Sequence, residues 1–184
     1  MKKIVLFFAT LLFPAMVFAS TASTATTAGE PNVSPIPAPV QYELPYPGML
    51  PNNPLYFLKQ ARDWILDKLI ADPVKKTEFY ILQGDKRVAM GMQLNDNGNG
   101  ALAEQTISKG EKYMNNAAAT LLALKSQGKD VPAYITDRLT QALAKHAEVL
   151  TDEIASTTDA TIKSGLTGSL NLVTTLRGEL SKIK

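Results

Sequence analysis

The sequence has no cysteine and only one histidine, His146, among its 184 residues. Without cysteine, the chain has no disulfide, no thiolate nucleophile, no thiolate metal site and no lipid-modified cysteine of the bacterial lipoprotein kind. A single histidine also excludes metal motifs that take two imidazole ligands from one chain. Thiol chemistry and two-histidine metal sites are therefore excluded.

An excess of charge of either sign is also missing. The chain carries 19 basic and 17 acidic residues, and two of the basic ones, Lys2 and Lys3, belong to a segment that we expect to be removed. A chain of balanced charge has no electrostatic basis for binding nucleic acid, so we expect no nucleic-acid partner. Hydrophobic residues make up 45% of the chain, which is enough for an ordinary globular core.

Residues 1–19 have the pattern of a signal peptide for export. Lys2 and Lys3 precede an uncharged and mostly apolar run over residues 4–18. This run is shorter than the roughly 20 residues that a helix needs to cross a bilayer. An uncleaved N-terminal anchor is the competing interpretation, and Pro14 together with the short run favours cleavage.

Val17 and Ala19 put small or compact side chains at the two positions that precede a signal cleavage site. We therefore predict cleavage after Ala19, with a cut after Ala22 as the alternative. No other window approaches 18 apolar residues, so we expect no membrane span after cleavage and a secreted or otherwise extracytoplasmic protein.

Residues 20–50 are predicted to be a disordered linker. The first part, residues 20–28, contains only Ser, Thr and Ala, and eight of the eleven prolines fall between Pro31 and Pro54. Such a segment buries too little apolar surface to order itself, and closely spaced prolines favour an extended chain. We expect it to tether the domain that follows.

Residues 51–184 have helical spacing of apolar residues and no strand-like alternation. Short connections make sequential helices pack antiparallel. The predicted fold is an all-α antiparallel helical bundle of about four long helices plus a shorter entrance helix, preceded by the Pro/Thr/Ser-rich tether. We expect helices at 54–71, at 73–95, at 101–127, after Pro132, and after a cap at Thr157 or Thr158.

The entrance helix is predicted from a cap at Asn53 and from Pro54 in its first turn. Leu55, Tyr56 and Leu58 are expected to lock the chain onto the bundle, in the manner of a hydrophobic staple. The apolar residues of this helix recur at helical spacing: Leu55, Leu58, Ile65 and Leu69.

Aromatic side chains on the first two predicted helices form a candidate patch for a ligand or a partner. They are Tyr56, Phe57, Trp64 and Phe79. Large aromatic side chains at helical spacing in a bundle usually belong to its core, and we favour that interpretation for these four.

His146 falls within the apolar stripe of the fourth predicted helix, and no nucleophile or second metal ligand is identifiable for it. We expect a hydrogen-bonded histidine in the core or at its rim. Charges of both signs on the second predicted helix are typical of a solvated face. These residues are Lys75, Lys76, Lys86 and Arg87, with Asp72, Glu78 and Asp85 among them.

The turn at residues 95–100, Asn-Asp-Asn-Gly-Asn-Gly, contains some of the oxygen ligands of a calcium-binding loop. The twelfth position counted from Asn95 is Thr106, where such a loop needs a bidentate glutamate. We interpret the segment as a plain turn. We also predict no bound metal, no cofactor and no catalytic residue in this chain.

The last predicted helix contains Gly165, Gly168 and Gly178. Each glycine costs roughly 1 kcal/mol relative to alanine in an exposed helix, so we expect this helix to be the least stable one. The alternative is that the glycines permit close helix approach, in which case Gly168→Ala would destabilise the protein.

One stretch of the sequence is specific enough to suggest a family. It reads Leu-Pro-Asn-Asn-Pro-Leu-Tyr-Phe-Leu-Lys over residues 50–59, and Asp-Pro-Val-Lys-Lys follows over residues 72–76. The region 44–76 resembles a family of exported bacterial domains of unknown function, in which LPxxPLYxLK follows a signal or membrane segment. The resemblance implies a helical domain without assigned catalytic residues. In related proteins such a domain looks like the extracytoplasmic part of a regulatory membrane protein.

Our leading hypothesis is an exported, non-enzymatic helical domain that serves as an interaction or structural module. Its expected partner is a protein of the cell envelope or of the extracellular medium. One alternative is a binding module that takes a small ligand or peptide in an interhelical pocket near Trp64. Another is the extracytoplasmic part of a regulatory system. A hydrolase is the weakest hypothesis, because no oriented partner for a serine or carboxylate mechanism is recognisable.

The exported form is expected to begin at Ser20, because the residues before it satisfy the cleavage pattern. N-terminal sequencing of the exported protein measures this directly. A start at Ser23 would support the alternative cut, whereas a retained Met1 or Lys2 would contradict cleavage.

Overall fold

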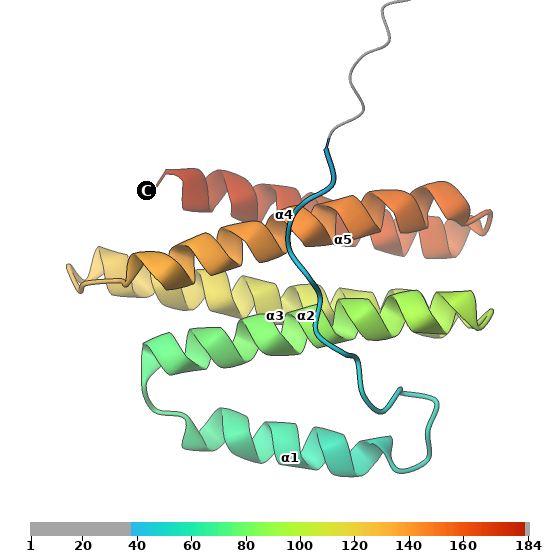
Figure 1. Ribbon diagram of the computed structural model, residues 1–184, viewed down its shortest axis with the longest axis horizontal. Coiled ribbons are helices and arrows are strands. Elements are labelled where there is room, and N and C mark those ends of the chain that lie inside the picture. The colour runs from blue at the N-terminus through green and yellow to red at the C-terminus, as the bar shows by residue number, and fades with distance from the viewer. Residues whose placement is uncertain (1–37, 183–184) are drawn as a thin grey trace, which may run out of the picture. The chain divides into compact units, whose positions relative to one another are not determined.

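The computed structural model describes residues 38–182, so the predicted signal peptide and the predicted linker up to residue 37 lie outside the described residues. The described part of the chain contains five helices and no strand (Figure 1), which confirms the all-α prediction. None of these helices combines the length and the apolar character that crossing a membrane requires. The helices are α1 (Tyr56–Leu69), α2 (Pro73–Asp96), α3 (Gly100–Ser126), α4 (Ala133–Ser156) and α5 (Ala160–Ser181).

Helices α2 to α5 form a four-helix bundle in which consecutive helices run antiparallel (Figure 1). The most extensive contact joins α2 and α3, and α4 packs on α5. Contacts of α3 with α5 and of α2 with α4 close the ring. The apolar stripes of the four helices meet in one core, where side chains such as Ile107, Leu121 and Leu143 are fully buried.

Local capping signals set the beginnings of α2 and α5. Asp72 caps α2, because its carboxylate accepts a hydrogen bond from the Lys75 N–H group at 2.8 Å. The cap of α5 is Asp159, and the prediction of Thr157 or Thr158 is wrong. Asp159 Oδ1 accepts the backbone N–H groups of Thr161 and Ile162, and its negative charge suits the positive end of the helix dipole better than a neutral hydroxyl does.

The entrance helix α1 is shorter than predicted. It begins at Tyr56, because Asn53 Oδ1 accepts the Leu55 N–H at 2.9 Å and closes a turn ahead of the helix. It ends at Leu69, before the predicted end at Ala71. α1 lies outside the four-helix ring, beside α2 (Figure 1).

Helices α2 and α3 approach each other closely at glycines. A Cβ atom added at Gly91 would overlap the side chain of Ile107 and lie 3.2 Å from the carbonyl oxygen of Ala103. A Cβ atom at Gly84 would lie 3.2 Å from the carbonyl oxygen of Gly110. Close packing leaves no room for such atoms, so this helix separation depends on glycine.

Residues 38–47, which we call the strap, run across α4 and α2 (Figure 1). The Val40 N–H donates to the Glu148 carboxylate at 2.6 Å, and the Tyr42 hydroxyl donates to Asp85 at 2.7 Å. The prediction of a disordered linker as far as residue 50 is therefore wrong for the strap. Its groups find partners in the bundle that the composition of the segment does not reveal.

Two of the three glycines of α5 have no neighbouring atoms where a side chain would lie. A Cβ atom at Gly168 or Gly178 would meet nothing within 4 Å, whereas one at Gly165 would overlap the Glu104 carboxylate. Close helix approach therefore does not explain the glycine at position 168. The low stability of α5 stays a prediction.

Gly168→Ala is expected to raise the free energy of unfolding by up to about 1 kcal/mol, because alanine favours the helix and its methyl group meets nothing there. Gly91→Ala is the matched control and is expected to lower the free energy of unfolding by about 1–3 kcal/mol, because its methyl group would overlap Ile107. Urea unfolding followed by circular dichroism measures both. Destabilisation by Gly168→Ala would contradict this account of α5.

Candidate functional site

Three charged side chains meet in the core of the bundle. His146 of α4 lies between Asp85 of α2 and Glu111 of α3, and none of the three is more than 1% exposed. The histidine Nδ1 is 3.0 Å from Glu111 Oε1, and Nε2 is 3.1 Å from Asp85 Oδ1. Each ring nitrogen therefore faces a carboxylate, which is the environment of a doubly protonated imidazolium.

Burial and the two carboxylates together set the charge of His146. Burial by itself lowers the pKa of His146, because a low-dielectric interior disfavours the charged form. The charge of Glu111 and hydrogen bonds with Asp85 and Glu111 outweigh burial and raise the pKa of His146 to about 9. The histidine is therefore a cation in the core at neutral pH.

Tyr42 of the strap completes this group, which we call the His146 cluster. Its hydroxyl donates to Asp85 Oδ2, while Asp85 Oδ1 faces the histidine, so the two carboxylate oxygens have different partners. Burial and the neighbouring Asp85 raise the pKa of Tyr42 above its usual value, so the hydroxyl remains a donor. The cluster joins α2, α3, α4 and the strap.

The geometry of the His146 cluster fits a structural role better than a catalytic or metal-binding role. On a doubly protonated imidazole neither nitrogen has a lone pair with which to accept a proton or bind a metal. The three charged side chains are sealed from solvent, so they stabilise one another and are not presented to a ligand. The prediction of a hydrogen-bonded histidine is confirmed, and its place is the core.

Sequence reasoning missed Asp85 and Glu111 as partners of the histidine. The prediction of a solvated charged face is wrong for Asp85 and Arg87, which are 1% and 6% exposed. The reason is that α2 is covered by α3, α4 and α1. A signal was present, because Asp85 follows Ile81 by four residues and precedes Val88 by three, on a buried stripe. Glu111 has the same spacing from buried apolar residues of α3.

Arg87 forms a second buried polar group, at the side of α2 that faces α1 and α3. Its Nη1 donates to Gln83 Oε1 at 2.8 Å, and its guanidinium lies 4.3 Å from the centre of the Tyr113 ring. Stacking on an aromatic ring and a hydrogen bond suit a weakly hydrated guanidinium. A cation therefore lies beneath α1.

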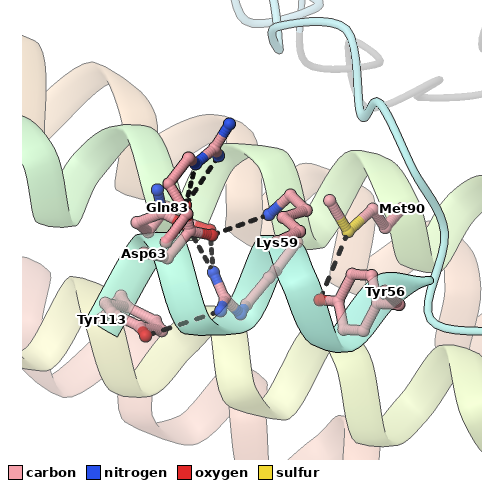
Figure 2. A network of polar contacts seen from close by, with 8 residues as sticks. Tyr56, Lys59, Asp63, Gln83, Met90 and Tyr113 are labelled. Carbon is pink, nitrogen blue, oxygen red and sulfur yellow. Dashed lines mark hydrogen bonds and ion pairs between the residues drawn. The ribbon is translucent and has the colours of Figure 1, made fainter. Parts of the chain in front are cut away.

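α1 turns its polar side toward this group. Asp63 is buried and accepts hydrogen bonds from Lys59 Nζ at 2.9 Å and from Arg62 Nη2 at 2.6 Å. Tyr56 is also buried, and its hydroxyl lies 3.9 Å from Met90 Sδ of α2 (Figure 2). These ion pairs lie within α1 itself. The contacts that join α1 to α2 are that of Tyr56 with Met90 and the hydrogen bond that Lys76 Nζ donates to the Asp67 carbonyl oxygen at 2.6 Å, so polar groups help to hold α1 against the bundle.

The apolar side of α1 is exposed as a result. Seven of the eleven exposed large hydrophobic side chains among residues 38–182 belong to α1 and the residue before it. The staple prediction is right for Tyr56 and wrong for Leu55 and Leu58, which face solvent. We define the outer face of α1 as five of these exposed side chains: Phe57, Leu58, Trp64, Ile65 and Leu69.

The four residues of the predicted aromatic patch do not share one surface. Tyr56 and Phe79 are buried, as expected for core residues, with 9% exposure each. Phe57 and Trp64 are 59% and 65% exposed and belong to the outer face of α1. The core interpretation is wrong for this second pair, because α1 docks through its polar side. Ligand or partner binding by the exposed pair stays a prediction.

The segment predicted as a turn connects α2 and α3. Gly98 has a φ of 76°, in a region that other residues rarely adopt. The Asn95 side-chain amide donates to Glu153 Oε2 of α4 at 2.6 Å, so this side chain ties the turn to the bundle. Within residues 38–182, no three His, Asp or Glu side chains are grouped so that they could hold a metal ion.

The protein is expected to lose stability as the pH rises from about 6.5 to about 9. Folding raises the pKa of His146 above its ordinary value of 6.5. Its contribution is therefore complete below that value and is lost as the pH rises through the folded pKa. The loss is on the order of 3 kcal/mol. Urea unfolding at pH 6, 7.5 and 9 measures it.

The histidine itself gives an independent readout, because it is the only one in the chain. Its ring proton signal in the NMR spectrum is expected to titrate near pH 9, and Glu111→Gln is expected to move that midpoint downward. A midpoint near 6.5 in the unsubstituted chain would contradict the imidazolium assignment.

Comparison with protein families gives one match. Residues 48–160, more than half of the chain, match a family described as a domain of unknown function (DUF5667). The matched range includes α1 to α4 and ends where α5 begins. Comparison with curated proteins gives no match, and comparison with solved structures gives none either. The chain therefore belongs to the DUF5667 family of domains of unknown function.

Proposed function

We propose that the chain is an exported, non-enzymatic helical module that acts by contact with a component of the cell envelope. The observation that carries this proposal is the outer face of α1. Contiguous apolar surface of this kind, rimmed by polar residues, marks interaction sites on soluble domains. Tyr56 and Asp67 on the other side of α1 contact Met90 and Lys76 of α2, so the apolar side of α1 is left free for a partner.

The charged groups of the core support contact rather than reaction as the mode of action. The His146 cluster and Arg87 are buried among protein atoms and have protein partners. The family description names no catalytic role. The basic residues Lys2 and Lys3, with the apolar run that follows them, support export.

The double substitution Phe57→Ser and Trp64→Ser is expected to move the chain from the envelope fraction to the soluble extracytoplasmic fraction. Both side chains are exposed, so the substitutions remove apolar contact surface without opening the core. Fractionation of the producing cells followed by immunoblotting measures the distribution. Tyr134→Ser is the matched control, because Tyr134 of α4 is 55% exposed and lies away from α1 in the sequence.

Deleting residues 2–19 tests export separately and is expected to retain the chain in the cytoplasm. An unchanged distribution for the outer-face double variant would contradict the contact role. Cytoplasmic location of the unsubstituted chain would contradict export.

A further inference from the structure

We propose that the outer face of α1 is a lipid-binding surface that lies in the headgroup region of an anionic membrane. This inference rests on the proposed function, since it names the chemistry of the partner that the outer face contacts. It goes beyond that function by assigning the partner to a lipid surface and not to a protein.

The size of the outer face is the first argument. Its five side chains are each about half exposed or more. At 100° per residue they lie within about 140° of the helix circumference, so they form one continuous strip. The exposed area is on the order of 600 Å², at the upper end of what a monomer leaves uncovered. Such a strip indicates an apolar partner.

The distribution of charge on α1 identifies the sign of that partner. Both carboxylates of the helix are turned inward, where Asp63 is paired with Lys59 and Arg62, and Asp67 is paired with Lys76 of α2. The cations Arg62 and Lys68 are exposed.

On the helix circumference, Lys68 falls within the outer face and Arg62 falls just beyond its edge. The Arg62 guanidinium is held by Asp63, whereas the long apolar stem of Lys68 can lie along a bilayer surface while its ammonium group reaches headgroup phosphates. Lys68 therefore gives the outer face a positive charge, which complements an anionic surface.

The same charges argue against a second copy of the chain as the occupant. In an isologous pair the outer face would meet itself, and Lys68 would approach the same positive charge of the second copy. The carboxylates that would relieve this repulsion face the bundle. A bilayer has no such conflict, because it supplies acidic headgroups beside apolar tails.

The residue types also fit an interfacial helix. Such helices carry Trp, Phe and Leu on one side and Lys or Arg at the boundary, and they lie in the plane of the membrane with the apolar side inserted. Trp64 is amphipathic, and tryptophan is enriched at the level of lipid headgroups. α1 would lie between the bilayer and the bundle, with Tyr56 and Asp67 in contact with α2 on the bundle side.

Trp64 is the only tryptophan of the chain, so its fluorescence reports on the outer face directly. The full-length chain, purified from the producing cells, is titrated with two kinds of vesicle. Neutral vesicles contain phosphatidylcholine alone, and anionic vesicles contain phosphatidylcholine with phosphatidylglycerol. We expect a blue shift with the anionic vesicles, a weaker response with the neutral ones, and a loss of binding as salt is added. Quenching by brominated lipid is expected to place Trp64 in the headgroup region.

Matched variants test the outer face separately from the rest of the chain. All of them keep the same N-terminus, so a difference in vesicle binding comes from the substituted residue. Phe57→Ser is expected to weaken vesicle binding on the order of tenfold, and Tyr134→Ser is expected to leave it unchanged. Lys68→Gln is expected to weaken binding about fivefold on anionic vesicles only. Lys125→Gln is its control, because both lysines lie in the last turn of a helix. Circular dichroism checks that each variant is folded.

Three results would overturn the lipid assignment. The first is the absence of any Trp64 response to anionic vesicles. The second is equal weakening by Phe57→Ser and Tyr134→Ser. The third is self-association in sedimentation that Phe57→Ser abolishes, which would make a second copy the occupant. If the outer face still determines envelope retention in cells while vesicles give no response, the partner is an envelope protein, and the proposed function stands without the lipid.

Discussion

The contact of His146 with Asp85 and Glu111 is the interaction on which the rest of the bundle depends. The three side chains come from three helices, so their ion pairs fix which faces of α2, α3 and α4 point inward. A buried charge that loses its partner costs about 3–5 kcal/mol, so the helices must keep this register. Tyr42 extends the same constraint to the strap and places residues 38–47 on the bundle.

Glycine makes that contact possible. Gly84 immediately precedes Asp85, and Gly110 immediately precedes Glu111. The backbones of α2 and α3 therefore touch where the two carboxylates emerge, and both carboxylates come within reach of a single imidazole. The close approach and the charged cluster are two aspects of one packing arrangement.

α1 follows a different rule from the four bundle helices. Those helices bury apolar stripes, whereas α1 buries Asp63 and Tyr56 and leaves Phe57 and Trp64 outside. Arg87 explains part of this choice, because a cation beneath α1 favours the phenol of Tyr56 over leucine, while Asp63 is buried together with its own partners Lys59 and Arg62. The bundle thus fixes the orientation of α1, and that orientation leaves its apolar strip exposed.

The amino-acid sequence by itself determined the five helices of residues 38–182, the cap at Asp72 and the turn at residues 95–100, because these depend on near neighbours in the chain. It also determined that α1 has an apolar side. Only the tertiary structure decided where that side points and which groups meet His146. Periodicity states which residues share a face of a helix, but not what that face contacts. The partners of His146 lie 35 and 61 residues away in the chain, and only the packing of α2, α3 and α4 brings them together.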